Sequence, residues 1–263
     1  MSNEYIINHY NNYDEDGRLL SRSGQPEFLT TVKYVEKHLF EGAKIIEIGA
    51  ATGRYSHYFA KKGYEVDAVE LVPSNIEKFK EKITPDEKIT ITEGNACDLS
   101  FIESEKYDIT LILGPLYHLY TEEDEKKALS EAIRITKKGG KVFAAYCMND
   151  FVVVQFCFLK NHINEERYKP LIDPVTFKLT STPEELFVMH TKAEIDKLMS
   201  GFNTERIAFV GTDMVSCYPD MQRTLEAMDD QTFETYMRYH FSICEREDLV
   251  GFSTHTLDIF KKL

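Results

Sequence analysis

One short segment combines a carboxylate with several small residues in a pattern that could hold a nucleotide. It reads EIGAATGRY, from Glu47 to Tyr55. Glycine allows the backbone to approach a ligand closely, and the N–H groups of a loop that opens a helix bind polar groups. The GxGxxG pattern of dinucleotide-binding loops would need glycine where the chain has Ala51 and Arg54. Because Gly53 comes one position early, the spacing disfavours a loop for a dinucleotide pyrophosphate.

A second carboxylate, Glu70, ends the next apolar segment, 21 positions after Gly49. This is about the spacing at which an acidic residue reaches the ribose hydroxyls of a nucleotide bound at the glycine loop. A solvated strand end is the alternative interpretation of Glu70. The glycine loop upstream favours the ribose role.

Two later segments could complete a site. The first reads GNACDL (94–99), in which Asp98 either contributes to the site or caps the next turn. The second reads LGPLYHL (113–119), in which His118 beside Tyr117 is the candidate to take a proton from a substrate. The alternative is that His118 is a structural residue that caps the following helix.

Together these segments resemble class I S-adenosylmethionine (SAM)-dependent methyltransferases. The pattern Glu47-x-Gly49-x-Ala51-x-Gly53 resembles the E/DxGxGxG cofactor loop of that family, with alanine in place of the usual middle glycine. GNACDL resembles its G-[DN]-A-x-x-L loop, and GPLYHL resembles a segment of its small-molecule enzymes. Nucleic-acid amino-methylating enzymes carry Asn or Asp where this chain has Gly114. The resemblance is strong over residues 25–147 and weak over the C-terminal strands.

The resemblance implies SAM as cofactor, S-adenosylhomocysteine (SAH) as product, and no metal. Asn95 and Ala96 would hold the adenine edge, while His118 and Tyr117 would be catalytic. The reaction would be an in-line displacement, in which the enzyme aligns donor and acceptor and excludes water. The cofactor-binding residues that we expect on this basis are Arg18, Glu47, Gly49, Ala50, Ala51, Gly53, Glu70, Leu71, Asn95, Ala96 and Leu113.

The N-terminal segment mixes aromatic residues with one arginine, and in related enzymes such a segment folds over the cofactor. We expect Arg18 to meet the cofactor carboxylate or an acidic substrate, and Tyr10 or Tyr13 to close the substrate site. A surface ion pair of Arg18 with Asp14 or Asp16 is the alternative.

The surrounding pattern predicts an α/β fold: a Rossmann-like, doubly wound, seven-stranded sheet, mostly parallel, with an antiparallel strand near the C-terminus and a helical or irregular insertion. Helices are expected at 25–39, 53–62, 74–82 (with Ser74 as N-cap), 122–136 (closed by Gly139-Gly140) and 191–200. Strands are expected at 44–48, 65–69, 89–93, 107–113, 141–146, 204–210 and 254–260, the last as an antiparallel edge partner.

We divide the chain into an N-terminal lid (1–24), a SAM-binding core (25–147), an insertion that covers the acceptor site (148–190) and a part that completes the sheet (191–263). An amphipathic stretch at 219–248, rich in Met and aromatic residues, lines an acceptor pocket or belongs to the core.

Composition excludes several classes of protein. The 263 residues carry a formal net charge of −13, which disfavours nucleic acid as a partner. The five cysteines form no CxxC pair and are interpreted as buried apolar residues. The N-terminus lacks a signal-peptide pattern and no apolar run could span a bilayer, so we expect a cytoplasmic protein without membrane contact.

The leading hypothesis is therefore an enzyme that transfers a methyl group from SAM to an unidentified small molecule. A non-catalytic SAM- or SAH-binding module is the first alternative, because a fold does not fix a function. A NAD-dependent oxidoreductase is the second, disfavoured by the position of Gly53 and the absence of glycine at Arg54.

Overall fold

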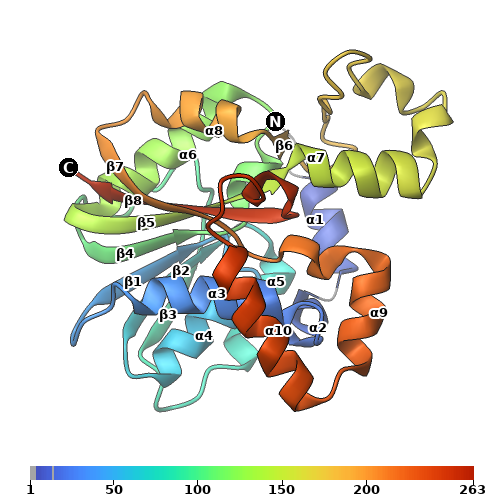
Figure 1. Ribbon diagram of the computed structural model, residues 1–263. Helices are drawn as coiled ribbons and strands as arrows, with labels where there is room; N and C mark the ends of the chain where they lie inside the picture. Colours follow the sequence, from blue (N-terminus) through green and yellow to red (C-terminus); the bar gives the residue numbers. More distant parts are fainter. Residues whose placement is uncertain (1–3, 14) are drawn as a thin grey trace.

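A twisted sheet lies between two layers of helices (Figure 1) in the computed structural model, which describes residues 4–13 and 15–263. The strands are β1 (Lys44–Ile48), β2 (Glu65–Glu70), β3 (Ile89–Glu93), β4 (Tyr107–Ile112), β5 (Thr136–Met148), β6 (Met189–His190), β7 (Thr204–Gly211) and β8 (His255–Lys262). The helices are α1 (Glu4–Asn11), α2 (Glu15–Leu20), α3 (Gln25–Glu36), α4 (Arg54–Lys61), α5 (Pro73–Glu81), α6 (Glu122–Ile135), α7 (Asn149–Val152), α8 (Lys192–Met199), α9 (Pro219–Ala227) and α10 (Asp230–Ile243). Short 3-10 turns include η1 (Pro115–His118) and η5 (Met214–Cys217), and a π-helical segment, η2, covers Val153–Leu159.

The strand order is β3-β2-β1-β4-β5-β8-β7, with the two-residue β6 paired to β5. All the pairings are parallel except those of β8, which is antiparallel to both β5 and β7. The predicted fold class is confirmed, although β6 makes an eighth strand. The edge position expected for the last strand is wrong, because β8 lies inside the sheet and β7 forms the edge. The chain order reverses beside β1, between β2 and β4, which is where open α/β sheets form ligand-binding crevices.

The two faces of the sheet form two hydrophobic cores. Side chains alternate between faces along a strand, so Ile46 and Ile48 pack with α6 and α8 while Ile45 packs with α3 and α4. These three isoleucines are almost fully buried. The buried β1 is therefore held from both sides, and the loop that follows it has a fixed position.

Two local expectations in the core are wrong. Helix α5 begins at Pro73 with Val72 as N-cap, and the Ser74 hydroxyl instead donates to Oδ1 of Asn11 at 2.6 Å. Proline fits the first helical position because its missing N–H needs no partner there. Helix α6 ends before Thr136, whose hydroxyl donates to the Ala132 carbonyl as the chain becomes extended. Gly139-Gly140 therefore lies in an irregular stretch of β5 rather than at a helix end.

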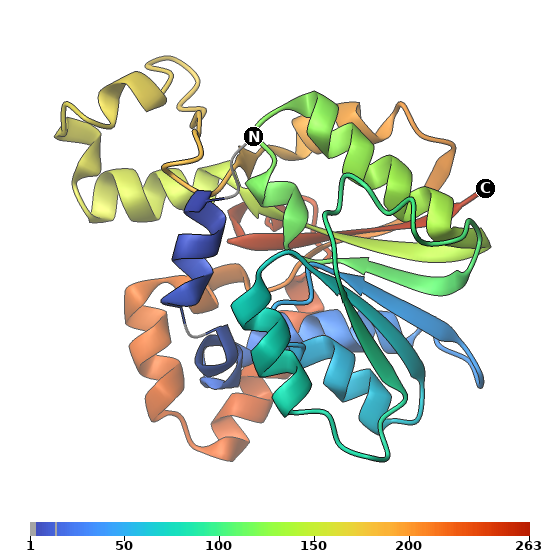
Figure 2. The ribbon, with the colours of Figure 1, turned by 180° about the vertical axis from the view of Figure 1, so that it is seen from behind.

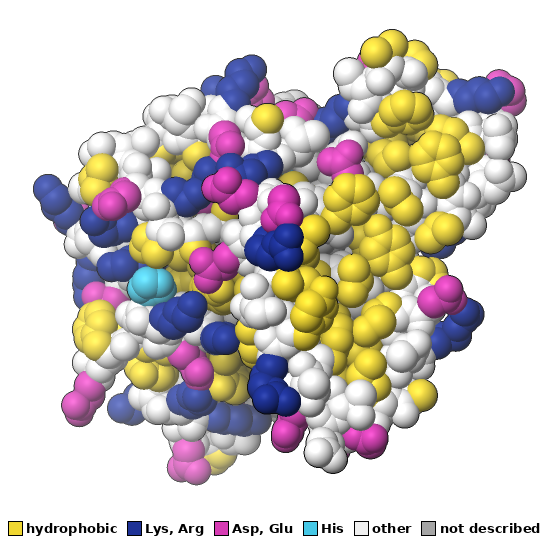
Figure 3. Space-filling model, viewed as in Figure 1, with side chains coloured by type: hydrophobic (Ala, Val, Ile, Leu, Met, Phe, Trp, Pro, Cys, Tyr) yellow, Lys and Arg dark blue, Asp and Glu magenta, His cyan; other side chains and the backbone are white. Residues whose placement is uncertain are grey.

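The predicted insertion segment runs from α7 through η2 to β6, with a small apolar cluster of its own around Cys157. Apolar side chains gather on the molecular face formed by this segment and the adjoining α9 (Figure 3). Phe158 and Leu159 are among the exposed large residues of the segment. Part of its apolar surface therefore remains uncovered.

The amphipathic stretch predicted at 219–248 forms two helices, because Asp229 caps a new helix by accepting from the Thr232 N–H at 2.7 Å. Its apolar residues form a core cluster around Leu225, Phe233 and Met237. Of the two alternatives for this stretch, the structure favours core packing.

Helix α1 lies beside α5 and the inserted segment (Figure 2). The Tyr5 hydroxyl donates to Oε1 of Glu184 in the insertion at 3.2 Å, and Ser74 of α5 bonds Asn11. These contacts place α1 over the carboxyl edge of the sheet. No helix in the described part of the chain has the length and apolar character needed to cross a membrane.

Candidate functional site

The loop after β1 has a backbone that only small residues can follow. Gly49 and Gly53 have φ angles of +74° and +88°, in the left-handed region. A Cβ on Gly49 would lie 2.6 Å from Cδ of Pro115, and one on Gly53 would lie 2.4 Å from the Phe79 ring. Both positions therefore require glycine for conformation and for space.

Ala51 also has a positive φ, of +46°, so it occupies a conformation that costs an alanine about 1–2 kcal/mol. The middle glycine of the family's pattern would adopt it without that cost. The N–H groups of Gly49 and Ala50 bond the Val69 carbonyl of β2 at 2.8 and 3.1 Å. The loop therefore keeps its shape despite the alanine.

Glu47 at the end of β1 is buried and holds the start of α4. Its carboxylate accepts from the backbone N–H of Ser56 at 2.9 Å and from the Ser56 hydroxyl. Burial raises the pKa of Glu47 to about 8, although the Ser56 bonds favour the ionised form. The predicted cofactor residue thus anchors the helix that follows the glycine loop.

Glu70 connects the ends of two strands. Its carboxylate accepts from the N–H groups of Ala51 at 2.8 Å and Val72 at 2.9 Å. Burial raises its pKa, and the hydrogen bonds to these N–H groups oppose that shift. Because each carboxylate oxygen has two lone pairs, Glu70 can also accept from ligand hydroxyls while it holds the loop.

Two adjoining cavities open at this edge of the sheet, and they share Tyr10, Gly49, Ala51 and Gly114. The walls of cavity A include Glu70, Leu71, Asn95, Ala96, Pro115 and His118. The walls of cavity B include Arg18, Glu27, Glu47, Ala50, Leu113, Tyr117 and His255. The structure thus brings the predicted cofactor residues together around one pair of cavities. Gly53 is the exception, because it belongs to the glycine loop but is not among the residues that line either cavity.

Asn95 and Ala96 form one wall of cavity A. The side-chain oxygen of Asn95 accepts from the Cys97 N–H at 2.9 Å, which leaves the amide nitrogen as a donor. Within the described chain, the Ala96 N–H has no hydrogen-bond partner. These donors at the cavity wall suit the edge of a purine base.

His118 is buried where η1 meets α1 and the insertion. Its Nδ1 bonds the Leu186 carbonyl at 2.9 Å, so Nδ1 carries the proton and Nε2 accepts from the Tyr10 hydroxyl at 2.9 Å. Burial lowers the pKa of His118 to about 4. The imidazole is therefore neutral at pH 7, and a substrate proton reaches Nε2 only if Tyr10 is displaced.

Tyr117 and Tyr13, the other aromatic candidates, have different surroundings. The Tyr117 hydroxyl donates to the Leu113 carbonyl at 2.9 Å, and its ring lies 6.2 Å from the ring of His255. Tyr117 lines cavity B. Tyr13 is 39% exposed, stacks on His9 and is not among the residues that line cavity A or B. Of the two expected substrate tyrosines, only Tyr10 lies at the cavities.

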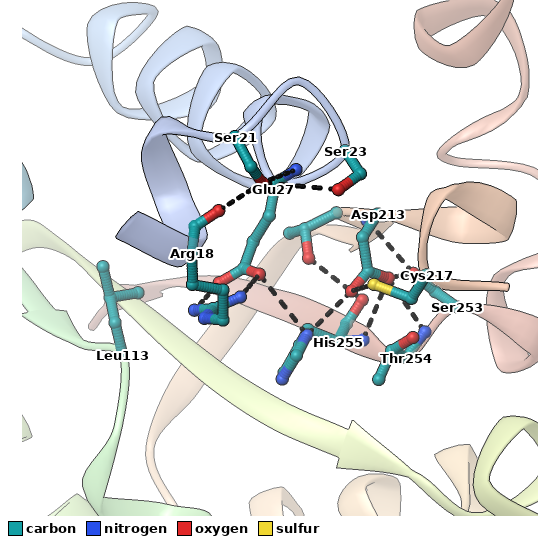
Figure 4. Close-up of polar contacts among 12 residues, drawn as sticks. Arg18, Ser21, Ser23, Glu27, Leu113, Asp213, Cys217, Ser253, Thr254 and His255 are labelled. Carbon is teal, nitrogen blue, oxygen red and sulfur yellow. Dashed lines mark hydrogen bonds and ion pairs between the residues drawn. The ribbon is translucent and has the colours of Figure 1, made fainter. Parts of the chain in front are cut away.

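Arg18 lies in cavity B, where it forms a two-bonded ion pair with Glu27 of α3 (Figure 4). Of the two surface partners weighed for Arg18, Asp14 lies outside the described residues, and so does the side chain of Asp16. The Glu27 carboxylate therefore orients the Arg18 guanidinium at the wall of cavity B.

The sequence interpretation missed a cluster formed by Glu27, Asp213 and His255. Asp213 follows β7 and His255 begins β8, and no local motif joins them. Nδ1 of His255 bonds Oδ2 of Asp213 at 2.7 Å and lies 3.5 Å from Oε2 of Glu27. The ligand atoms of all three residues lie within 4.8 Å of one another, close enough to share a metal ion. Nδ1 instead donates to Asp213 and Arg18 neutralises Glu27, so the cluster is a hydrogen-bonded ion network in this structure.

Cavity A fits a cationic nucleoside better than a dinucleotide. No Lys or Arg is among the described residues that line it, whereas Glu70 and Asp124 are. A pyrophosphate would meet carboxylates with no cation to neutralise it, while a sulfonium nucleoside would benefit from them. Donors for a base, a carboxylate for ribose hydroxyls and a glycine loop for an amino acid portion are the groups that SAM requires.

Comparisons with known proteins agree with this fit. Residues 46–144 match the methyltransferase domain family. A chain of Methanocaldococcus jannaschii, whose name provisionally assigns it to ribosomal RNA large subunit methylation, is 29% identical over 168 residues, 61% of this chain and 41% of its own. The demethylmenaquinone methyltransferase of Renibacterium salmoninarum is 31% identical over 104 residues, 40% of this chain and 41% of its own. The chain thus spans about two fifths of the length of these relatives.

The fold is shared with solved structures over the whole chain. A SAM-dependent methyltransferase of Thermotoga maritima, described as a possible histamine N-methyltransferase, aligns over 100% of both chains with a TM-score of 0.58 and 17% identity. The chain therefore has the fold of SAM-dependent methyltransferases. The match to the methyltransferase domain family extends over residues 46–144 of this chain.

Proposed function

We propose that this chain transfers a methyl group from SAM to a small-molecule acceptor. The observation that carries the proposal is the pair of cavities joined at the glycine loop, one lined by nucleoside-binding groups and the other by acidic and basic side chains. When bound, SAM supplies an electrophilic methyl group on a sulfonium sulfur. The chain's own residues bind SAM and the acceptor, orient them for reaction and exclude water from the site.

In this proposal cavity A holds the adenosine portion. Glu70 accepts from the ribose hydroxyls, while Asn95 and the Ala96 N–H bond the adenine edge. Leu71, beside Glu70 in the same wall, packs against the base. This arrangement leaves the junction near Gly49 and Gly114 for the sulfonium.

Cavity B holds the amino acid portion and the acceptor. Carbonyl oxygens at the ends of β1 and β4 can accept from the ammonium group, and Arg18 can bond the carboxylate at the cavity wall. The Tyr117 hydroxyl fixes the Leu113 carbonyl and thereby the end of β4. The reaction needs these groups mainly to hold donor and acceptor in line.

We propose that residues 1–24 and 148–190 close this site as a lid and a cover around the 25–147 core, with 191–263 completing the sheet. The contacts of α1 with Glu184, Ser74 and His118 support closure by one helix. Water is then excluded where the methyl group moves, which suppresses hydrolysis.

A small acceptor is favoured over RNA for this chain. The net charge of −13 opposes the approach of a phosphate backbone. Residues of α1 and of the insertion line cavity A, and no Lys or Arg is among the described residues of its lining. The relative that acts on demethylmenaquinone is named for a small acceptor, whereas the archaeal relative is named for RNA. We place more weight on the charge and the covered site.

Calorimetric titration of the purified chain with SAM, SAH and NAD tests the proposal. Micromolar binding of SAM and SAH without binding of NAD is expected. Binding of NAD alone would contradict the fit of cavity A. Release of labelled SAH from SAM during a screen of small acceptors then separates an enzyme from a non-catalytic binding module.

A further inference from the structure

The carboxylate of Asp213 is organised to hold one imidazole. It is fully buried and accepts from the Ser253 hydroxyl at 2.6 Å and from the Thr254 and His255 N–H groups at 2.8 and 3.1 Å. Its other oxygen bonds Nδ1 of His255 at 2.7 Å. Because the carboxylate is held from several directions, it fixes both the tautomer and the orientation of the His255 ring.

The opposite ring nitrogen of His255 points away from both carboxylates (Figure 4). No hydrogen bond joins His255 Nε2 to another group among the described residues, and the side chain is 20% exposed. His255 lines cavity B together with Gly49 and Tyr117. A carboxylate on Nδ1 and an accessible Nε2 in a ligand cavity form the arrangement by which imidazoles take protons in hydrolases.

Charged and titratable groups face His255 from every element around it. These are Glu27 of α3, Asp213 after β7, Arg18 of α2 through Glu27, Cys147 of β5, Cys217 of η5 and Tyr117 of η1. Burial opposes charge on His255, but the two carboxylates outweigh it and raise its pKa well above the usual value. The ring therefore carries a proton below this raised pKa and can accept one only above it, so the base role requires a pH above the His255 pKa.

We infer that His255, positioned by Asp213 and Glu27, is the proton acceptor for an acceptor molecule that reacts through a hydroxyl group. The inference rests on the proposed function, because it concerns the acceptor side of the same site. A neutral hydroxyl is a weak nucleophile and gains most from a base, whereas an amine attacks as its free base. The apolar neighbours Leu19 and Leu257 in cavity B suit a partly apolar alcohol or phenol.

The proposed step conserves atoms and electrons. The acceptor oxygen forms an O–CH3 bond as the methyl–sulfur bond breaks, and the sulfur keeps that electron pair. The hydroxyl proton passes to Nε2 of His255, and the new positive charge lies against Asp213 and Glu27. The proton leaves to solvent after product release.

His255 suits this role better than His118, for reasons of geometry. Both ring nitrogens of His118 are bonded, one to Leu186 and one to Tyr10. Of these two histidines, His255 is the one that combines a carboxylate on one nitrogen with an accessible second nitrogen.

Absorption spectroscopy with 4-nitrophenol, a hydroxyl compound whose ionisation is visible, tests the inference on the full chain saturated with SAH. We expect the bound probe to ionise at least about one pH unit below the free probe. The shift should disappear in His255→Gln and decrease in Asp213→Asn and Glu27→Gln. His162→Gln, a change at a part-exposed histidine beside Glu165, is the matched control and should keep the shift.

SAH affinity, measured by calorimetry on the same samples, shows whether each variant is folded. One contradicting result is a wild type that binds SAH but not the probe, and another is a wild type that binds both and leaves the ionisation of the probe unshifted. Either result overturns the role of His255 and leaves the proposed function intact. An equal shift in His255→Gln overturns it as well. Failure of the wild type to bind SAH overturns the proposed function and the acceptor role together.

Discussion

The Tyr10 hydroxyl donates to Nε2 of His118 at 2.9 Å, so helix α1 is bonded directly to the turn after β4. His118 in turn bonds Leu186 of the insertion. One neutral imidazole therefore ties three segments together over the cofactor cavity.

Loss of this bond should weaken cofactor retention. Tyr10→Phe removes one hydrogen bond, worth about 0.5–1.5 kcal/mol, so SAH affinity should fall about 2- to 10-fold by calorimetry. His118→Gln should have at least as large an effect, because it also removes the bond to Leu186, and the double variant should be no worse than His118→Gln alone, since the Tyr10 bond is already lost there. Tyr58→Phe, which loses a bond to Glu36 on the surface, is the control. A loss of turnover in His118→Gln far beyond that in Tyr10→Phe would instead support His118 as the base.

The free energy of unfolding should decrease at acid pH because His118 is buried in its neutral form. The pKa of His118 is about 4 in the folded chain and 6.5 in the ordinary case. Between these two pH values the unfolded chain binds a proton at His118 and the folded chain does not. The contribution is fully present above pH 6.5 and is lost as the pH falls toward 4, by up to about 3 kcal/mol. Urea unfolding at several pH values should show a shallower loss in His118→Gln. A residual loss is expected from His240, whose pKa is also lowered to about 4 by burial.

The stability of the protein should be sensitive to added side chains at the two glycines of the loop and insensitive to glycine at position 51. Gly49→Ala and Gly53→Ala should destabilise the protein by more than about 1 kcal/mol, because each adds a Cβ to a left-handed residue in a crowded space. Ala51→Gly should change the free energy of unfolding by less than about 1 kcal/mol, because relief of the left-handed strain offsets the added freedom of the unfolded chain. Chemical denaturation measures both. A large loss in Ala51→Gly would contradict this account of the loop.

Glu70→Ala should lower SAM and SAH affinity about 10- to 100-fold, since hydrogen bonds to a carboxylate contribute about 1.5–3 kcal/mol. Glu70→Gln keeps the volume and separates loss of charge from loss of packing. Glu93→Ala, at the exposed register partner of Glu70 on β3, is the matched control and should bind normally. Equal affinity in Glu70→Ala would contradict the ribose assignment.

His255 should titrate above the ordinary histidine range. Its raised pKa means that its contribution to stability is present below the unfolded pKa and is lost as the pH rises through the folded value. Nitrogen-15 NMR of the histidines should show this midpoint in the wild type. Glu27→Gln should move the midpoint to lower pH because it removes one carboxylate charge. A midpoint at or below 6.5 in the wild type would contradict the proposed network.

Much of the cofactor side could be predicted from the sequence, because its determinants are local. Gly49 and Gly53 are required by the backbone of one loop, and Glu70 and Asn95 follow strands that end at the same edge of a parallel sheet. Alternation of apolar and polar residues then predicts which strands are buried. The confirmed fold class and the common position of Gly49, Glu70 and Asn95 at cavity A follow from short-range patterns.

The acid–base network was decided by tertiary structure alone. Glu27, Asp213 and His255 come from a helix, a loop after β7 and the start of β8, and they meet only because β8 lies between β5 and β7. Arg18 pairs with Glu27 for the same reason, since helix packing rather than sequence spacing brings the two side chains together. Residue type and spacing thus determined which residues gather at the glycine loop, whereas the order of the sheet determined which side chains meet at cavity B.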